Sequence, residues 1–149
     1  MKVQIFDHLV ESPGAGGVAF APMLYIPSGI TDVSFYENAF DARELRRFIN
    51  EDGTIHVSEL IIGNAIFHLH EPTNNTSASN PAAMGYTTVV IGLFVDDVHA
   101  IVTQAEAAGA RIVSPVEDYD YGYRQGEVID PFGHRWQIQK AIAQKPDLQ

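Results

Sequence analysis

Two histidines and two glutamines near the ends of predicted strands are the side chains of this chain best suited to chemistry. His68 and His70 lie two residues apart on one strand, and Gln137 and Gln139 lie two apart on another. Because successive side chains of a strand point to opposite faces, each pair shares one face of its sheet. Imidazole can bind a metal ion or act as a general base, whereas a glutamine amide is a weak neutral ligand. We therefore predict a binding face around these four residues, with His68 as the candidate catalytic residue. The alternative is that His68 is a half-buried structural histidine and that His70 and Gln139 are strand ends facing solvent.

The segment 117–124 contributes a second set of candidate binding residues, because it combines three tyrosines, three acids and one arginine. Tyr121 and Tyr123 offer aromatic faces and hydroxyl groups. Arg124 could hold a carboxylate or a phosphate. We predict an irregular loop that contacts ligand. Two alternatives stay open: the tyrosine rings cover a sheet edge, and Arg124 pairs with a neighbouring aspartate.

Glu59 is a further candidate, on a strand predicted over residues 56–62. His56 lies three positions before it, and an odd offset on a strand places two side chains on opposite faces. The two residues therefore cannot converge on one ion. Glu59 either supports the core or lines the binding face.

Two copies of one βαβββ pattern position these residues. The first copy has predicted strands at 21–26, 44–49, 56–62 and 65–69 and a helix at 31–40; the second has strands at 87–95, 111–113, 126–129 and 135–139 and a helix that Asp96 or Asp97 caps. We predict an α+β fold in which both modules form a curved mixed-sheet cup within a single domain, 1–149. The modules span residues 20–71 and 86–140, and a connector rich in Pro, Asn, Ser, Thr and Ala spans 72–85.

A tight hairpin is predicted at Asp130-Pro131-Phe132-Gly133, since Pro fixes φ in the turn and Gly accepts positive φ. The surrounding stretch, residues 121–136, resembles the closing hairpin of the glyoxalase/bleomycin-resistance/extradiol-dioxygenase superfamily, also called vicinal oxygen chelate, and most closely its PhnB-like branch. The segments 35–40 and 58–63 are similar to further motifs of that branch. The resemblance extends over about residues 20–140 and implies the two-module cup, a homodimer and a small-molecule ligand.

The resemblance also implies four metal-ligand positions, two in each module. They fall at Ala21, at Phe67 or His68, at Val90 and at Gln137. Alanine and valine cannot coordinate a cation, so His68 and Gln137 are the remaining donors. One imidazole and one amide would bind a divalent ion poorly. We therefore predict no cofactor and disfavour a divalent metal.

Composition narrows the class of partner. A formal net charge of −10 argues against nucleic acid, which needs a basic face. The sequence contains no run of 18 consecutive apolar residues, so no membrane span is predicted. The absence of cysteine excludes disulfides and thiol chemistry. The expected compartment is the cytoplasm. The favoured function is a metal-free protein that binds a small aromatic or cationic molecule. The alternatives are an isomerase, lyase or dioxygenase-type enzyme that uses His68 with a metal or as a base, and a ligand-free structural dimer.

Overall fold

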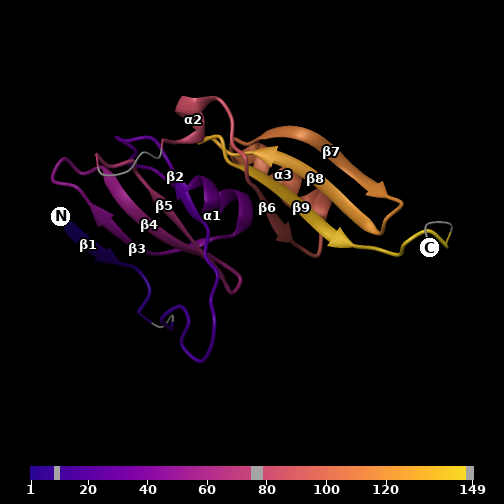
Figure 1. Cartoon of the computed structure of the whole chain (residues 1–149), viewed down its shortest axis with the longest axis horizontal. Coiled ribbons are helices and arrows are strands. Elements are labelled where there is room, and N and C mark those ends of the chain that lie inside the picture. The colour runs from indigo at the N-terminus through magenta and orange to yellow at the C-terminus, as the bar shows by residue number, and fades with distance from the viewer. Residues whose placement is uncertain (9–10, 75–78, 147–149) are drawn as a thin grey trace.

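The computed structural model describes residues 1–8, 11–74 and 79–146, which form two mixed sheets and three helices (Figure 1). The first module contains β1 (Lys2–Ile5), β2 (Met23–Tyr25), α1 (Phe35–Phe40), β3 (Arg43–Ile49), β4 (Ile55–Ile62) and β5 (Ala65–His70). The second contains β6 (Val90–Phe94), α3 (Val98–Ala108), β7 (Arg111–Tyr119), β8 (Tyr123–Ile129) and β9 (Arg135–Ala141). The predicted α+β fold with two βαβββ modules is confirmed. Within the described ranges, no helix is long and apolar enough to cross a membrane.

The four βαβββ strands have the same order in both modules, and the first sheet has β1 as an additional edge strand. The first sheet has the order β1-β3-β4-β5-β2 and the second the order β6-β9-β8-β7. β2 runs parallel to β5, and β6 runs parallel to β9, while the other neighbouring strands are antiparallel. Each module thus places its first βαβββ strand at a sheet edge, beside its last strand.

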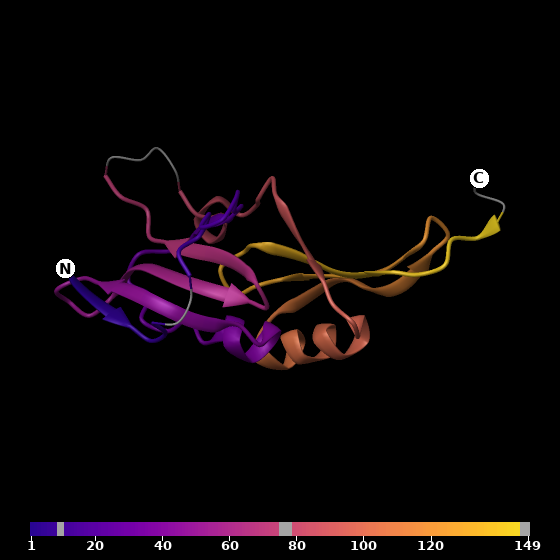
Figure 2. The same cartoon turned by 90° about the horizontal axis from the view of Figure 1, so that it is seen from below.

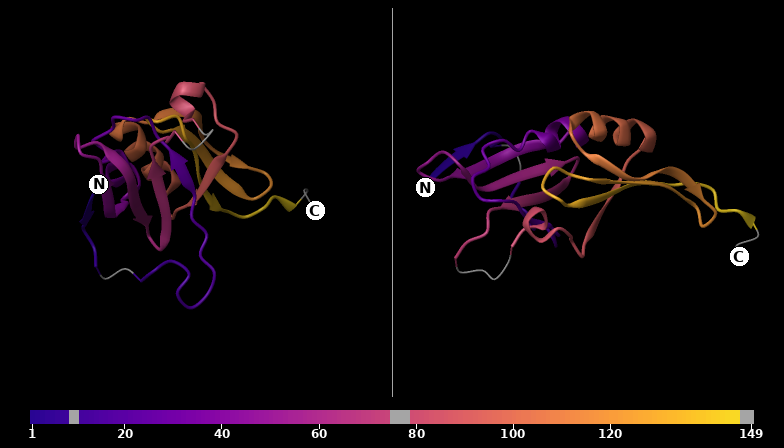
Figure 3. Two further views of the ribbon diagram at one scale, coloured as in Figure 1. Left: turned by 60° about the vertical axis from the view of Figure 1, so that its left-hand side comes forward. Right: turned by 90° about the horizontal axis from the view of Figure 1, so that it is seen from above.

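The helices α1 and α3 lie on one side of both sheets and leave most of the opposite faces open. Figures 2 and 3 show α1 and α3 next to each other along that side, with the two sheets extending in opposite directions. Phe67 and Leu69 of β5 are buried in the core, and so are Trp136 and Ile138 of β9. The alternating residues, among them His68 and Gln137, therefore occupy the open faces, as the strand period predicts.

The two modules share one hydrophobic core, which contains Tyr36, Phe40 and Val102 together with Trp136. The rings of Phe40 and Trp136 lie 4.8 Å apart. Aromatic pairs at such distances add to the free energy of burial. This packing fixes the first module against the hairpin at Asp130, where the turn forms as predicted and the φ of Gly133 is 91°.

Several local predictions were wrong. The segment 117–124 is not an irregular loop, because β7 continues to Tyr119 and β8 begins at Tyr123. The first helix covers residues 35–40 instead of 31–40. The predicted cap of the second helix is confirmed, because the side chain of Asp97 accepts a hydrogen bond from the amide of Ala100 at the start of α3.

The connector predicted over residues 72–85 is described except for residues 75–78. It contains a short helix, α2 (Pro81–Met84), whose first turn is capped by the buried side chain of Asn80. Asn80 accepts a 3.0 Å hydrogen bond from the amide of Ala83. The connector therefore contains a defined turn. Pro81 and Ala82 of this turn lie against Gly133 of the hairpin.

Candidate functional site

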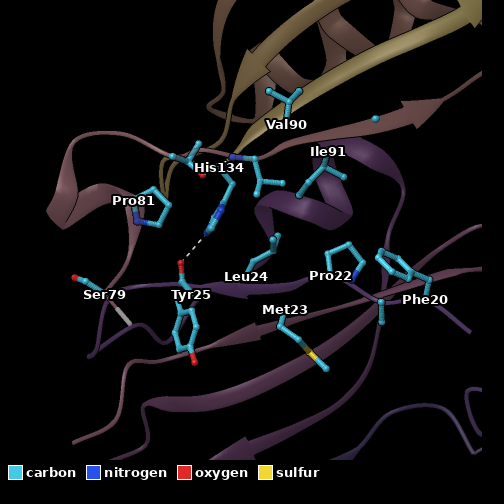
Figure 4. Close-up of a pocket in the computed structure, with 14 residues that line it drawn as sticks. Phe20, Pro22, Met23, Leu24, Tyr25, Ser79, Pro81, Val90, Ile91 and His134 are labelled. Atoms are coloured by element: carbon cyan, nitrogen blue, oxygen red, sulfur yellow. Dashed lines mark hydrogen bonds between the residues drawn. The ribbon is translucent and has the colours of Figure 1, made fainter. Parts of the chain in front are cut away.

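A groove of about 630 Å3 lies between the edge strands β2 and β6, where the two modules meet (Figure 4). Its lining comes from β2 and the residues before it, from β6 and the residues before it, and from the connector and the hairpin: Phe20, Ala21, Pro22, Met23, Leu24, Tyr25, Ser79, Pro81, Thr87, Val89, Val90, Ile91, Gly92 and His134. A volume of this size is typical of pockets for small molecules.

The lining is uncharged, although the chain carries 19 acidic residues and nine lysines or arginines. Among the described residues that line the groove there is no Asp, Glu, Lys or Arg. Several of its apolar side chains remain exposed, with Phe20 at 93%, Met23 at 54% and Val90 at 45%. Apolar surface of this kind, gathered at a concave site, favours an apolar ligand.

His134 lines the groove and connects the two modules there. Its Nε2 atom lies 2.7 Å from the backbone oxygen of Tyr25, so the hairpin of the second module bonds to β2 of the first (Figure 4). The side chain is 7% exposed. His134 therefore acts as a structural bridge, which agrees with a role in the turn region and not in catalysis.

The groove also reaches Gly92, beside a network of amides on the open face of the second sheet. Gln139 Oε1 accepts hydrogen bonds of 2.9 Å from Gln125 Nε2 and from Gln137 Nε2. Gln125 Oε1 in turn accepts a 2.5 Å hydrogen bond from the Tyr121 hydroxyl. The predicted site residues Gln137, Gln139 and Tyr121 thus belong to one hydrogen-bonded set. Gln139 is 9% exposed, so it is not a strand end facing solvent.

The tyrosines of the β7–β8 hairpin form a row of aromatic contacts. The rings of Tyr119 and Tyr121 are stacked with centroids 5.2 Å apart, and Tyr121 and Tyr123 are 6.0 Å apart. Tyr123 also contacts Phe94 of β6, at 6.3 Å. The row borders the amide network and supplies exposed aromatic area next to it.

Arg124 is engaged within the protein. Its Nε and Nη2 atoms donate hydrogen bonds of 2.7 and 3.0 Å to the carboxylate of Asp118. Arg124 therefore pairs with a neighbouring aspartate through Nε and Nη2, which was the alternative to ligand binding.

The predicted residues of the first module gather on the open face of the first sheet. Arg46 holds the Glu59 carboxylate through hydrogen bonds of 2.5 and 3.1 Å, and the His68 Nε2 atom lies 3.8 Å from Glu59 Oε1. The rings of His68 and His70 are stacked at 5.7 Å. Glu59 is therefore not a core support, and His56 pairs on the other face with Glu71 at 2.9 Å.

Burial lowers the pKa of His68, although the nearby Glu59 carboxylate opposes this shift. Burial also lowers the pKa of His70, and the neighbouring His68 and His56 lower it further. Both imidazoles are therefore neutral at pH 7. A neutral His68 beside a carboxylate has the form of a general base.

The structure does not join the two sets of predicted residues. His68, His70 and Glu59 belong to the first sheet, whereas Gln137 and Gln139 belong to the second. Among the described residues, no hydrogen bond, ion pair or ring contact links one set to the other.

A protein metal site needs several donors that converge on one point. In the part of the chain that the structure describes, no group of three or more His, Asp or Glu side chains is arranged to hold one. Ala21 and Val90, the other expected ligand positions, line the apolar groove. His68 has Glu59 beside it, but Arg46 already occupies that carboxylate.

Sequence reasoning missed several residues of the site. Gln125 lies opposite Gln139 in the strand pairing. Its position two residues after Tyr123, which places both side chains on one face of a strand, could have indicated that Gln125 belongs to the site. Phe20 and Met23 carry no sequence signal for a groove, because the groove forms where two distant strand edges approach each other.

Comparison with known proteins relates the whole two-module unit to proteins of one family. The sequence profile of the Glyoxalase/Bleomycin resistance protein/Dioxygenase superfamily matches residues 31–138. The uncharacterized protein Mb0911c of Mycobacterium bovis is 35% identical over 127 residues, which cover 83% of this chain and 84% of that protein.

Solved structures agree with this assignment. TioX from Micromonospora sp. ML1 is 28% identical with a TM-score of 0.64, covering 85% of this chain and all of that chain (100%). The Arabidopsis thaliana gene product AT5G48480 is 26% identical with a TM-score of 0.67, covering 83% of this chain and 98% of that chain. The fosfomycin resistance protein FosX from Mesorhizobium loti, at 15% identity and a TM-score of 0.54 over 83% of this chain and 92% of its own, shares the fold. The chain belongs to the Glyoxalase/Bleomycin resistance protein/Dioxygenase superfamily.

Proposed function

We propose that this protein binds a small apolar molecule, aromatic in at least part, without a metal ion. The observation that carries this proposal is the groove of about 630 Å3 with an uncharged lining. An aromatic ligand suits such walls, whereas a cationic ligand would lose its hydration without gaining a counter-charge there. The exposed rings of Phe20 and Phe94 lie along the same strand edges and extend the apolar surface. Within the superfamily, the motifs at residues 35–40 and 121–136 support the PhnB-like branch.

Titration with the uncharged fluorescent probe N-phenyl-1-naphthylamine tests this function. The wild type should enhance probe emission with saturation at one probe per chain. Val90→Glu places a charge in the groove and should weaken binding at least tenfold. Val3→Glu is a matched control, because Val3 is 46% exposed and Val90 45%, while Val3 lies on β1 away from the groove. Equal binding by both variants would reject the groove as the site.

We also propose that two copies of the chain associate. Among the described residues, the edge strands β2 and β6 have one unpaired side each, and Phe94 of β6 is exposed outside the groove lining. Open edges and exposed apolar area are features of association surfaces. Sedimentation equilibrium should give twice the mass of one chain. A ligand-free structural dimer would show that mass and no saturable probe binding.

The second candidate is an enzyme in which His68 is a general base. The 3.8 Å separation from the Glu59 carboxylate and the lowered pKa of His68 favour it. An activity of this kind should decline as pH falls through the pKa of His68, and His68→Gln should abolish it. His99→Gln changes an exposed histidine on α3 and serves as the control.

A further inference from the structure

We infer that the ligand of the groove is an uncharged molecule with a carbonyl oxygen beside its apolar body, and that Gln139 recognises this oxygen. The inference rests on the proposed function and specifies the chemical class of the ligand. It follows from three features: the place of Gln139 at the end of the groove, the direction of its hydrogen bonds, and the charges around it.

Gly92 brings the amide of Gln139 to the groove. A Cβ atom built on Gly92 would lie 2.7 Å from Gln139 Nε2, which is closer than side-chain atoms approach. Gly92 is also part of the groove lining. The missing side chain therefore lets the Gln139 nitrogen lie directly over β6, where the apolar walls end.

In the structure the hydrogen-bond network uses one end of the Gln139 amide. Its oxygen accepts from two side-chain nitrogens, those of Gln125 and Gln137. Reversing the Gln139 amide alone would set its NH2 group against two other NH2 groups. The oxygen is thus fully used, and among the described residues no acceptor faces Gln139 Nε2. The nitrogen retains two N–H donors for a ligand.

The charges on this face do not favour a charged ligand group. Glu127 forms an ion pair with Arg135, and Glu117 lies opposite Gln125 in the strand pairing. An anionic group would meet the Glu117 carboxylate or have to displace the Glu127–Arg135 pair, and a cationic group would face the N–H donors of Gln139. A neutral carbonyl oxygen needs no counter-charge and can accept hydrogen bonds from the free N–H groups of Gln139. This makes a ketone, ester or amide oxygen the matching group.

Fluorenone and fluorene test this inference, because both are planar and uncharged and differ by one carbonyl group. Equilibrium dialysis of the whole chain against each probe gives two dissociation constants. The wild type should bind fluorenone about 3- to 10-fold more tightly than fluorene, the range of one net hydrogen bond. Gln139→Leu should reduce that ratio to about one, since leucine fills the space without a donor.

Two further variants keep the test decisive if Gln139→Leu folds poorly. Gln139→Glu retains the oxygen that Gln125 and Gln137 bond but removes the free donors, and should also abolish the preference. Gly92→Ala should lower the preference by displacing the amide. Gln4→Leu, on the exposed strand β1, should leave it unchanged.

The outcomes separate the inference from the proposed function. If wild type binds both probes equally, the role of Gln139 is rejected while groove binding stands. If wild type binds neither probe, the proposed function is rejected together with the inference. A preference for fluorenone that survives both changes at Gln139 would also overturn the inference.

Discussion

The Tyr36 hydroxyl donates a 2.6 Å hydrogen bond to Asp130 Oδ2, which joins α1 of the first module to the hairpin of the second. The same oxygen accepts a 3.0 Å hydrogen bond from Trp136 Nε1, and Oδ1 accepts from two backbone amides of the turn. Asp130 is 3% exposed and Tyr36 is fully buried (0% exposed). Burial raises the pKa of Tyr36 well above its usual value, and the Asp130 charge raises it further. The phenol therefore remains a donor, and the buried carboxylate remains hydrogen-bonded.

Tyr36→Phe should lower the free energy of unfolding by about 1–3 kcal/mol, because it removes one hydrogen bond to a buried carboxylate while keeping the ring. Urea unfolding followed by Trp136 fluorescence measures this change. Tyr86→Phe is the control, since Tyr86 is 62% exposed and the same atom is removed there. Equal stability of the two variants would show that the bond between the modules contributes nothing.

Much of the fold could be predicted because its strands, turns and helix caps depend on residues close together in the sequence. The alternation of Phe67 with His68 and of Trp136 with Gln137 determined which face of each strand is buried. The turn at Asp130 and the cap at Asp97 depend on a few neighbouring residues, so they too were predictable. Two copies of one pattern then implied two similar modules.

The site was less predictable because it depends on contacts between distant segments. The sequence predicts a loop at residues 117–124 because the residues there are polar or aromatic on both faces, which hides the strand period. The approach of Gly92 to Gln139 depends on the pairing of two strands that are about a third of the chain apart in sequence. The separation of His68 from Gln137 depends on how the modules pack through α1 and α3, for which no local pattern exists.

Acidification should destabilise the protein below pH 6.5. Burial lowers the pKa values of His68 and His70 from the ordinary value of 6.5, so the unfolded chain binds more protons than the folded one below that pH. The stabilisation is present above pH 6.5 and is lost as pH falls through the folded pKa values. The charged groups on the same face as the two imidazoles are Glu59 and Arg46, and His56 acts on His70 from the other face of the sheet.

Urea unfolding at a series of pH values from 5 to 8, about the range in which histidine titrates, measures this dependence. His70→Gln should reduce the slope of unfolding free energy against pH below 6.5, since one of the two shifted groups is removed. His99→Gln, at an exposed position of α3, should leave the slope unchanged. A slope that persists in the double variant of His68 and His70 would assign it to other groups.

Protein purified without chelator should hold far less than one zinc, nickel, manganese or iron ion per chain. His68 lies beside His70, whose Nε2 has no hydrogen-bond partner among the described residues, but Arg46 holds the Glu59 carboxylate, so no third free donor completes a site there. Inductively coupled plasma mass spectrometry gives the metal content. His68→Ala should not change it, nor should His56→Ala, which alters a histidine paired on the opposite face with Glu71. One equivalent of metal that disappears with His68→Ala alone would contradict the metal-free proposal.

Gly133→Ala should destabilise the protein more than Gly53→Ala does. Both glycines have positive φ, 91° and 86°, so both substitutions impose similar backbone strain. At Gly133 the added Cβ would also lie 2.9 Å from the Cβ of Pro81 and 3.1 Å from the amide of Ala82, whereas at Gly53 nothing lies within 4 Å. Relief of the clash requires α2 to move away from the hairpin.

The expected difference in unfolding free energy between these two variants is about 1–3 kcal/mol, the usual cost of overpacking. Thermal unfolding at one pH measures it, with Gly53→Ala supplying the contribution of φ alone. Because Pro81 also lines the groove, Gly133→Ala should weaken binding of N-phenyl-1-naphthylamine as well, while Gly53→Ala should not. Equal stability and equal probe binding in the two variants would mean that α2 is not held against the hairpin in solution.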